Sequence, residues 1–258
     1  GDAFVLQTEF LMQILEGIHK YLPNIKHVTT YARADSIARK SVSELRELKT
    51  AGIEHLYCGM ETGSDLILRK INKGFDAATI IISGTKAKEA GMVLSEFTLF
   101  GIGGKELAEE NAVETAKVLN VIKPDFVRVH ATGIKLSSEM WNYVKNKELT
   151  LQSEEEIVSE QKIMLELLAD DMDCIYMNEH IVNLLLEVRG NIRTDKQNML
   201  ETINTYLQLP KQEQELFNLG RRLNIMFFLA DLNNRAKRKQ TEEGLRKIKT
   251  QNPDLDLA

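Results

Sequence analysis

The chain has 258 residues, of which 43 % are hydrophobic and 28 % are charged, and its mean hydropathy is -0.25. This composition is that of a globular protein, and it argues against a disordered chain, a collagen-like chain and a disulfide scaffold. The net charge of -5 argues against a nucleic-acid surface spread over the whole protein, and no apolar run approaches the roughly 18 to 20 residues of a membrane helix.

Helical and extended segments alternate along the first half of the chain. Apolar residues recur at helical spacing from Phe10 to Leu22, and the strand-like segment 27–33 follows. Ser41 and Glu44 have the spacing of a capping box, which predicts a helix that ends at Ala51-Gly52. The alternation continues with a strand at 54–59, a helix at 77–90, a strand at 92–100, a helix at 106–122 and a strand at 125–131.

This order predicts an α/β fold, because short connections between alternating strands and helices are typical of a parallel sheet. We expect residues 1–150 to form an incomplete parallel, TIM-like partial barrel. A second capping box at Ser153 and Glu156 opens a long helix, and segments 199–207 and 213–228 also have helical periodicity. Residues 151–258 are therefore expected to form a mostly helical C-terminal extension.

Strand alternation predicts which side chains face the interior of the partial barrel. In the last strand Phe126, Arg128 and His130 share one face; the corresponding groups in the earlier strands are Tyr31 with Arg33, Tyr57 with Gly59 and Glu61, and Glu96 with Thr98. Buried charges need partners or water, so a shared face predicts a polar interior that holds a ligand, formed by Arg33, Glu61, Glu96, Arg128 and His130. The alternative is that these strands are half exposed and that their charges meet only water.

Three motifs occur in a characteristic order: Gly1-Asp2-Ala3, then Gly59-Met60-Glu61-Thr62-Gly63-Ser64-Asp65 with Asn72-Lys73-Gly74, then Gly101-Ile102-Gly103-Gly104. Together with the strand at 126–130 they resemble the radical S-adenosylmethionine (radical SAM) superfamily of iron-sulfur oxidoreductases. The resemblance is to the branch related to oxygen-independent coproporphyrinogen oxidase.

The resemblance implies a role for individual residues. Asp2 would meet the amino group of the methionine moiety of SAM, and Glu61 would contact its ribose or methionine part. Gly101 and Gly103 would let the backbone approach the adenine. Arg128 and His130, with Tyr31 and Arg33 on the same inner face, would contact the cofactor or the substrate. Alternatives stay open for Glu61, as an acid at a helix N-terminus, and for His130, as a structural residue.

One feature of the superfamily is missing from this sequence: the C-x-x-x-C-x-x-C loop that holds a 4Fe-4S cluster. The two cysteines, Cys58 and Cys174, are far apart and are expected to be buried structural residues, as in a protein of the reducing cytoplasm. We therefore expect the N-terminal cluster-binding part to be missing, and neither a metal site nor bound cofactor in this chain. The intact protein would use SAM, the cluster and an electron donor such as flavodoxin or ferredoxin to act on a small molecule or on another, unknown substrate.

Two other functions are considered. The chain could be a non-catalytic binding module derived from a barrel. A cofactor-free lyase or aldolase would need a lysine that forms a Schiff base or three metal ligands at the strand ends, and neither is apparent in the sequence. The basic segment 233–239 is followed by acidic residues, which favours a solvated helix face over nucleic-acid binding. His180 and Asn183 either reach the site or fasten the helical half to the barrel.

Overall fold

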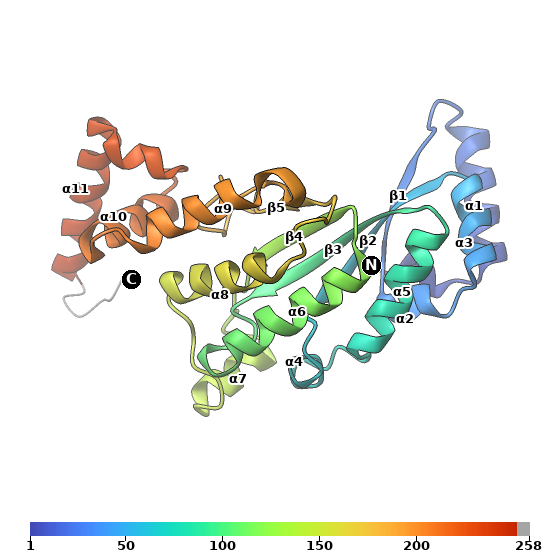
Figure 1. Ribbon diagram of the computed structural model, residues 1–258, viewed down its shortest axis with the longest axis horizontal. Coiled ribbons are helices and arrows are strands. Elements are labelled where there is room, and N and C mark those ends of the chain that lie inside the picture. The colour runs from blue at the N-terminus through green and yellow to red at the C-terminus, as the bar shows by residue number, and fades with distance from the viewer. Residues whose placement is uncertain (252–258) are drawn as a thin grey trace.

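The computed structural model describes residues 1–251 (Figure 1). Its sheet has six strands in chain order: β1 (Val28–Ala32), β2 (Ile53–Glu61), β3 (Val93–Phe100), β4 (Phe126–Ala131), β5 (Ile175–Met177) and β6 (Gly190–Asn191). Neighbouring strands from β1 to β5 are parallel, and β6 is antiparallel to β5. The predicted α/β fold, an incomplete parallel barrel, is confirmed.

Helices connect and cover the strands. The α-helices are α1 (Thr8–Tyr21), α2 (Ala34–Ala38), α3 (Val42–Thr50), α4 (Asp65–Lys70), α5 (Ala77–Glu89), α6 (Ala108–Ile122), α7 (Glu139–Lys145), α8 (Glu154–Leu167), α9 (Ile192–Leu207), α10 (Lys211–Arg222) and α11 (Arg235–Gln251). Short 3-10 helices are η1 (Ala3–Val5), η2 (Lys105–Leu107) and η3 (Leu229–Asn233). Both predicted capping boxes form, at the starts of α3 and α8.

The C-terminal half differs from the prediction in one respect. It is mostly helical, as expected, but β5 and β6 extend the sheet beyond β4. These strands have three and two residues, which is too short for an alternating pattern to be visible in a sequence. The helix predicted at 213–228 also ends earlier, at Arg222.

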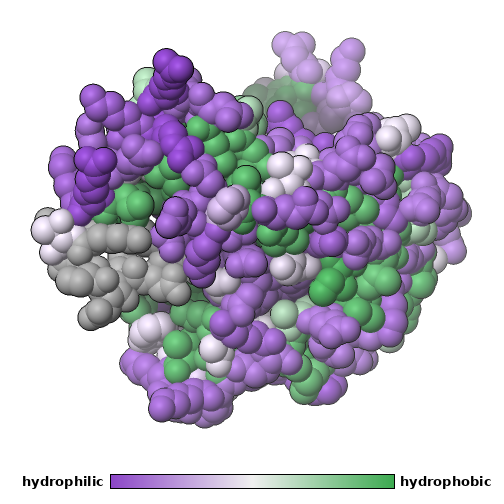
Figure 2. Space-filling model, turned by 60° about the vertical axis from the view of Figure 1, so that its left-hand side comes forward, coloured by the Kyte–Doolittle hydropathy of each residue, from purple (hydrophilic) through white to green (hydrophobic). Residues whose placement is uncertain are grey.

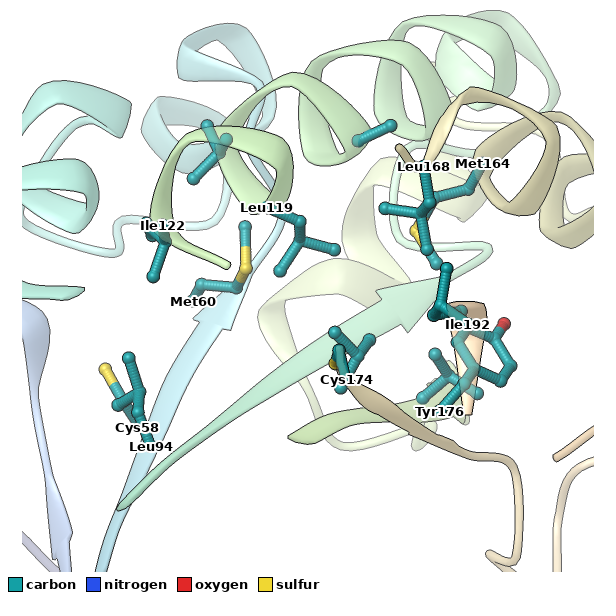
Figure 3. Packing of buried hydrophobic residues seen from close by; sticks show 14 of the residues in the cluster. Cys58, Met60, Leu94, Leu119, Ile122, Met164, Leu168, Cys174, Tyr176 and Ile192 are labelled. Atoms are coloured by element: carbon teal, nitrogen blue, oxygen red, sulfur yellow. The ribbon is translucent and has the colours of Figure 1, made fainter. Parts of the chain in front are cut away.

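The hydrophobic core lies between one face of the sheet and the helices α5, α6 and α8 (Figure 1). Figure 3 shows Met60 of β2 near Leu119 and Ile122 of α6, and both cysteines inside this layer. Burial raises the pKa of the Cys58 thiol well above its ordinary value and that of Cys174 to about 12. Both cysteines are therefore buried structural residues, as predicted.

The outer surface is largely polar. Hydrophilic residues dominate the face shown in Figure 2, and hydrophobic ones lie in separate groups between them. Among residues 1–251, no helix combines the length and the apolar character needed to cross a membrane.

The loop after β2 packs directly against the backbone of α6, which predicts a large effect of a single methyl group. A Cβ on Gly63 would overlap the carbonyl oxygen of Glu114 and lie 2.8 Å from the Cα of Thr115. Because backbone cannot move aside as a side chain does, Gly63→Ala should lower the free energy of unfolding by about 3 kcal/mol or more. Urea unfolding measures this change.

The matched control is Gly17→Ala in α1, where an added Cβ has open space around it. This substitution should be neutral or should stabilise the protein by up to about 1 kcal/mol, since alanine is the better helix former. Equal effects of the two substitutions would contradict the close contact between the loop and α6.

Candidate functional site

The carboxyl ends of the parallel strands bring the predicted site residues to one edge of the sheet. Arg33 follows β1, Glu61 ends β2, Gly101 follows β3 and His130 lies near the end of β4. Ligand sites form at this edge in parallel α/β folds because loops there vary while the packed strands hold them in place.

An irregularity in β2 directs Glu61 to the face of the sheet opposite the hydrophobic core, which we call the open face. The pairing register with β3 shifts between Gly59 and Glu61, and Glu61 has a left-handed φ of 65°. Such bulges next to functional sites turn a side chain in a new direction, at a cost in backbone strain. The Oε1 atom of Glu61 is 2.7 Å from the Nζ of Lys73, whereas Oε2 accepts no hydrogen bond from residues 1–251.

Arg33 joins Asp2 to the same cluster. The Asp2 carboxylate accepts hydrogen bonds from the Arg33 backbone N–H at 3.2 Å and from the Ser36 hydroxyl at 2.6 Å. The Arg33 side chain donates to the Lys73 carbonyl at 2.9 Å. Asp2, Arg33, Lys73 and Glu61 therefore form one connected polar cluster, in which both oxygens of Asp2 already have partners within the chain.

The glycine turn after β3 is held by a residue that sequence reasoning missed. Glu160 of α8 is 1 % exposed, and its carboxylate accepts hydrogen bonds from the Gly101 N–H at 3.0 Å and from the side-chain amides of Asn111 and Gln152. Burial raises the pKa of Glu160 to about 7 despite these donors. Gly101 has a φ of 81°, which favours glycine. A Cβ on Gly103 would lie 2.9 Å from the Cβ of Leu107, so this position is also tightly packed.

The open face of the sheet carries the other predicted residues. Tyr31, Arg128 and His130 lie on this face, away from the hydrophobic core, as strand alternation predicted. The guanidinium of Arg128 lies 5.1 Å from the centre of the Tyr57 ring. Glu61, at the end of β2, lies near His130 at the same edge of the sheet. The expected inner wall is thus met in part, by Tyr31, Glu61, Arg128 and His130.

The structure corrects the face of the sheet that we expected for Glu96. We expected it with Thr98 on the inner face, but Leu94, Glu96 and Thr98 face the helices, and Glu96 is 0 % exposed. Neither oxygen of its carboxylate accepts a hydrogen bond from a nitrogen or oxygen donor among residues 1–251, although the Cys58 thiol lies beside it. The reason is the phase of β3: Ser95 and Phe97 occupy the inner positions, opposite Phe126 and Arg128 of β4. A charged residue in this strand was wrongly assigned to the polar side.

His180 and Asn183 both contact β4. The Asn183 amide donates to the Val129 carbonyl at 2.7 Å and accepts from the Ala131 N–H at 2.8 Å. It thus takes the place of a neighbouring strand's peptide group beside His130. The His180 ring stacks on His130, with ring centres 4.1 Å apart. The first contact fastens the helical half to the barrel, and the second extends the open face.

The residues at this edge suit an organic cofactor better than a metal cluster. The free carboxylate oxygen of Glu61 and the glycine turn fit the hydroxyl and ammonium groups of a nucleoside derivative such as SAM. A 4Fe-4S cluster does not fit: the only two cysteines of the sequence are buried in the core, and residues 1–251 contain no group of three or more His, Cys, Asp or Glu arranged for a metal ion.

Comparisons with known proteins give distant relatives. No protein-family model matches the chain. It is 24 % identical over 167 residues to the heme chaperone HemW of Bacillus subtilis (strain 168), which covers 64 % of this chain and 43 % of HemW. The chain therefore spans less than half of the length of this relative.

One solved structure shares the fold, and a second has a weaker likeness. The Elp3 protein of the archaeon Methanocaldococcus infernus, with an N-terminal deletion, superposes with a TM-score of 0.51 at 15 % identity, over 66 % of this chain and 44 % of Elp3. Methylornithine synthase (PylB) has a TM-score of 0.43 at 15 % identity, over 76 % of this chain and 50 % of PylB. The likeness to Elp3 shows that the parallel sheet and its helices form an established architecture.

Proposed function

Because the chain is related to the radical SAM superfamily through HemW, we propose that it is the SAM-holding part of a radical SAM iron-sulfur oxidoreductase. In this proposal residues 1–150 form most of the partial barrel that holds SAM, and residues 151–251 add β5, β6 and a mostly helical extension. Reductive cleavage of SAM belongs to the intact enzyme, whose cluster is held outside these residues and is supplied with electrons by a donor such as flavodoxin or ferredoxin. The substrate is not identified by this proposal.

The single observation that carries the proposal is the position of Glu61. A bulge and a left-handed backbone conformation turn its carboxylate onto the open face at the carboxyl edge, where one oxygen remains available. Strain of this kind persists when the surrounding structure holds it in place, and it concentrates at binding sites. A carboxylate in this position suits a ribose hydroxyl or an ammonium group.

The remaining residues support the same ligand. Asp2, Tyr31 and Arg33 are proposed to border the methionine end of SAM, and Gly101 and Gly103 to border the adenine. Arg128 and His130 are proposed to face the cofactor carboxylate or the substrate. These roles follow from the resemblance together with the shared edge and face of the sheet.

A non-catalytic binding module is the second candidate, and one observation favours it. Glu61 is already paired with Lys73, so the polar cluster is partly neutralised without any ligand. The two functions differ in whether the protein forms 5'-deoxyadenosine, the product of SAM cleavage.

The test compares the complete reading frame with the 258-residue chain. Both are incubated anaerobically with iron, sulfide, SAM and a reductant, and 5'-deoxyadenosine is measured by chromatography. We expect release from the complete protein and none from the chain alone, since its cysteines are buried in the core. In the complete protein, Glu61→Gln should raise the KM for SAM about tenfold or more, corresponding to a lost charge-assisted hydrogen bond.

The control in the same assay is Glu54→Gln, which changes a carboxylate near the amino end of β2 that pairs with His27. It should leave the KM for SAM unchanged. A complete protein that binds a cluster but releases no 5'-deoxyadenosine would overturn the enzymatic proposal and favour the binding module.

A further inference from the structure

A ladder of aromatic rings covers the open face of the sheet. The ladder consists, in order, of the rings of Phe126, His55, Tyr57, Tyr31 and Phe97. The centres of rings in contact are separated by 4.5 to 6.4 Å, and the ring centre of Phe97 lies 5.4 Å from that of His130. Several of these rings are close to parallel, with interplanar angles of 24° to 33°. The ladder spans four neighbouring strands, β1 to β4.

These rings do not fill the hydrophobic core. None of them belongs to the core cluster, which lies on the other face of the same strands, and Tyr31 is 58 % exposed. At the neighbouring core positions the strands carry smaller side chains such as Ala32, Cys58 and Val127. Large, partly exposed aromatic rings gathered on one face are unfavourable in water, and such a patch indicates a ligand-binding surface.

One cation lies within the ladder without a carboxylate partner. The guanidinium of Arg128 lies over the rings of Tyr57 and Phe126, at 5.1 and 5.7 Å, and it donates to the Ser95 hydroxyl at 3.4 Å. No Asp or Glu among residues 1–251 forms an ion pair with it, in contrast to the Lys73 ammonium, which Glu61 neutralises. Its other N–H groups are available to an anion.

Two imidazoles near Arg128 are shifted towards their neutral forms. Burial, and then the charge of Arg128, lowers the pKa of His55; burial, and then His180, lowers the pKa of His130. A cavity of about 210 Å³ opens beside His130 and is lined by Arg128, Val129, His130, Met177, Glu179 and His180. The carboxylate of Glu179 is held by Arg189 at 2.5 Å, so its charge is neutralised within the chain.

We infer that this face binds a small anionic molecule with a flat conjugated ring, its ring against the ladder and its carboxylate on Arg128. The assignment rests on the proposed function only in that the ligand would be the substrate of the enzyme. Stacking on aromatic rings selects a planar molecule, and the Arg128 guanidinium selects a carboxylate. Both features are needed to distinguish a flat acid from both a flat alcohol and a saturated acid.

The experiment measures binding to the 258-residue chain by isothermal titration calorimetry with three probes. These are 2-naphthoate, the neutral 2-naphthalenemethanol and the saturated decahydro-2-naphthoate. We expect 2-naphthoate to bind at least tenfold more tightly than either of the other two. Equal affinities for the three probes, or no binding of 2-naphthoate, would overturn the inference.

Two variants separate the two contributions. Arg128→Met should weaken binding of 2-naphthoate at least tenfold and leave the affinity for the alcohol unchanged. Tyr57→Leu should weaken both naphthalene probes several-fold and leave the saturated acid unchanged. The control Arg193→Met, whose guanidinium contacts the carbonyl of Asp171 instead, should change none of them. Unchanged binding of 2-naphthoate to Arg128→Met would overturn the inference.

The two proposals fail separately, because this titration contains no SAM and the assay for 5'-deoxyadenosine contains no naphthalene probe. Selective binding of 2-naphthoate without 5'-deoxyadenosine release would keep the ring-binding face and remove the enzymatic proposal. The reverse pair of results would remove the ring-binding face alone.

Discussion

Replacing Arg221 by methionine should destabilise the protein by about 3 to 5 kcal/mol, because four backbone carbonyl groups would lose a buried, charged donor. Arg221 of α10 is 3 % exposed. Its guanidinium donates to the carbonyls of Ile181, Asn183, Leu184 and Met226 at 2.7 to 3.3 Å. It thereby holds the segment that carries His180 and Asn183 against β4. Urea unfolding monitored by circular dichroism measures the effect.

The adjacent residue provides a matched control. Arg222 is more exposed and forms an ion pair with Glu154, and such pairs contribute about 1 kcal/mol or less. Arg222→Met should therefore change the free energy of unfolding by no more than this amount. Arg221→Lys should lie between the two, since lysine keeps the charge and loses the fork of donors. Equal stability of the Arg221 and Arg222 variants would contradict the role given to Arg221.

Replacing Glu96 by glutamine should stabilise the protein at alkaline pH. Burial raises the pKa of Glu96 to about 8 although the neighbouring Cys58 thiol lowers it, and neither carboxylate oxygen has a nitrogen or oxygen donor among residues 1–251. Between its ordinary pKa of 4.5 and about 8 the folded protein keeps a proton that the unfolded chain releases, so stability falls as the pH rises through this window. Above it the carboxylate is ionised in both states, and the full penalty, on the order of 4 kcal/mol, remains.

Glu96→Gln removes this pH dependence. The variant should equal the parent protein near pH 4.5 and exceed its stability increasingly up to pH 9, as measured by urea unfolding at a series of pH values. Glu160→Gln is the control, since Glu160 is equally buried but accepts three hydrogen bonds. In Glu160→Gln the N–H groups of the new amide would face other hydrogen-bond donors, so the free energy of unfolding should decrease. A stability gain for Glu96→Gln that is the same at pH 5 and pH 9 would contradict the buried, uncompensated carboxylate.

The order of the elements was predictable because each carries a local signal. Helical periodicity marks α1, and capping boxes mark α3 and α8, where the hydrogen bonds of the capping boxes form as expected. The short strands β5 and β6 and the short helices α2, α4 and α7 carry too few residues for a period to show. They form because the surrounding chain packs around them, which no local pattern records.

The inner face of the site was predictable where a strand alternates cleanly. Phe126, Arg128 and His130 lie as expected because β4 places small apolar residues between them. Glu96 was assigned to the wrong face because its polarity was taken as the sign of the inner face. Strand alternation decides the direction instead: the next residue, Phe97, points to the inner face, so Glu96 points to the helices. Glu160 and Arg221 were missed because a charged residue on a helix usually meets water. Their partners are backbone groups distant in sequence, and only the folded structure brings these together.

The Asn183 amide has a consequence for the lateral growth of the sheet. β5 pairs with β4 only as far as Arg128. Without a further partner, the last residues of β4 would have unpaired peptide groups with which another molecule could form hydrogen bonds. Asn183 satisfies the two groups beside His130. Because exposed strand edges invite pairing between molecules, this one side chain protects the protein from self-association at that edge.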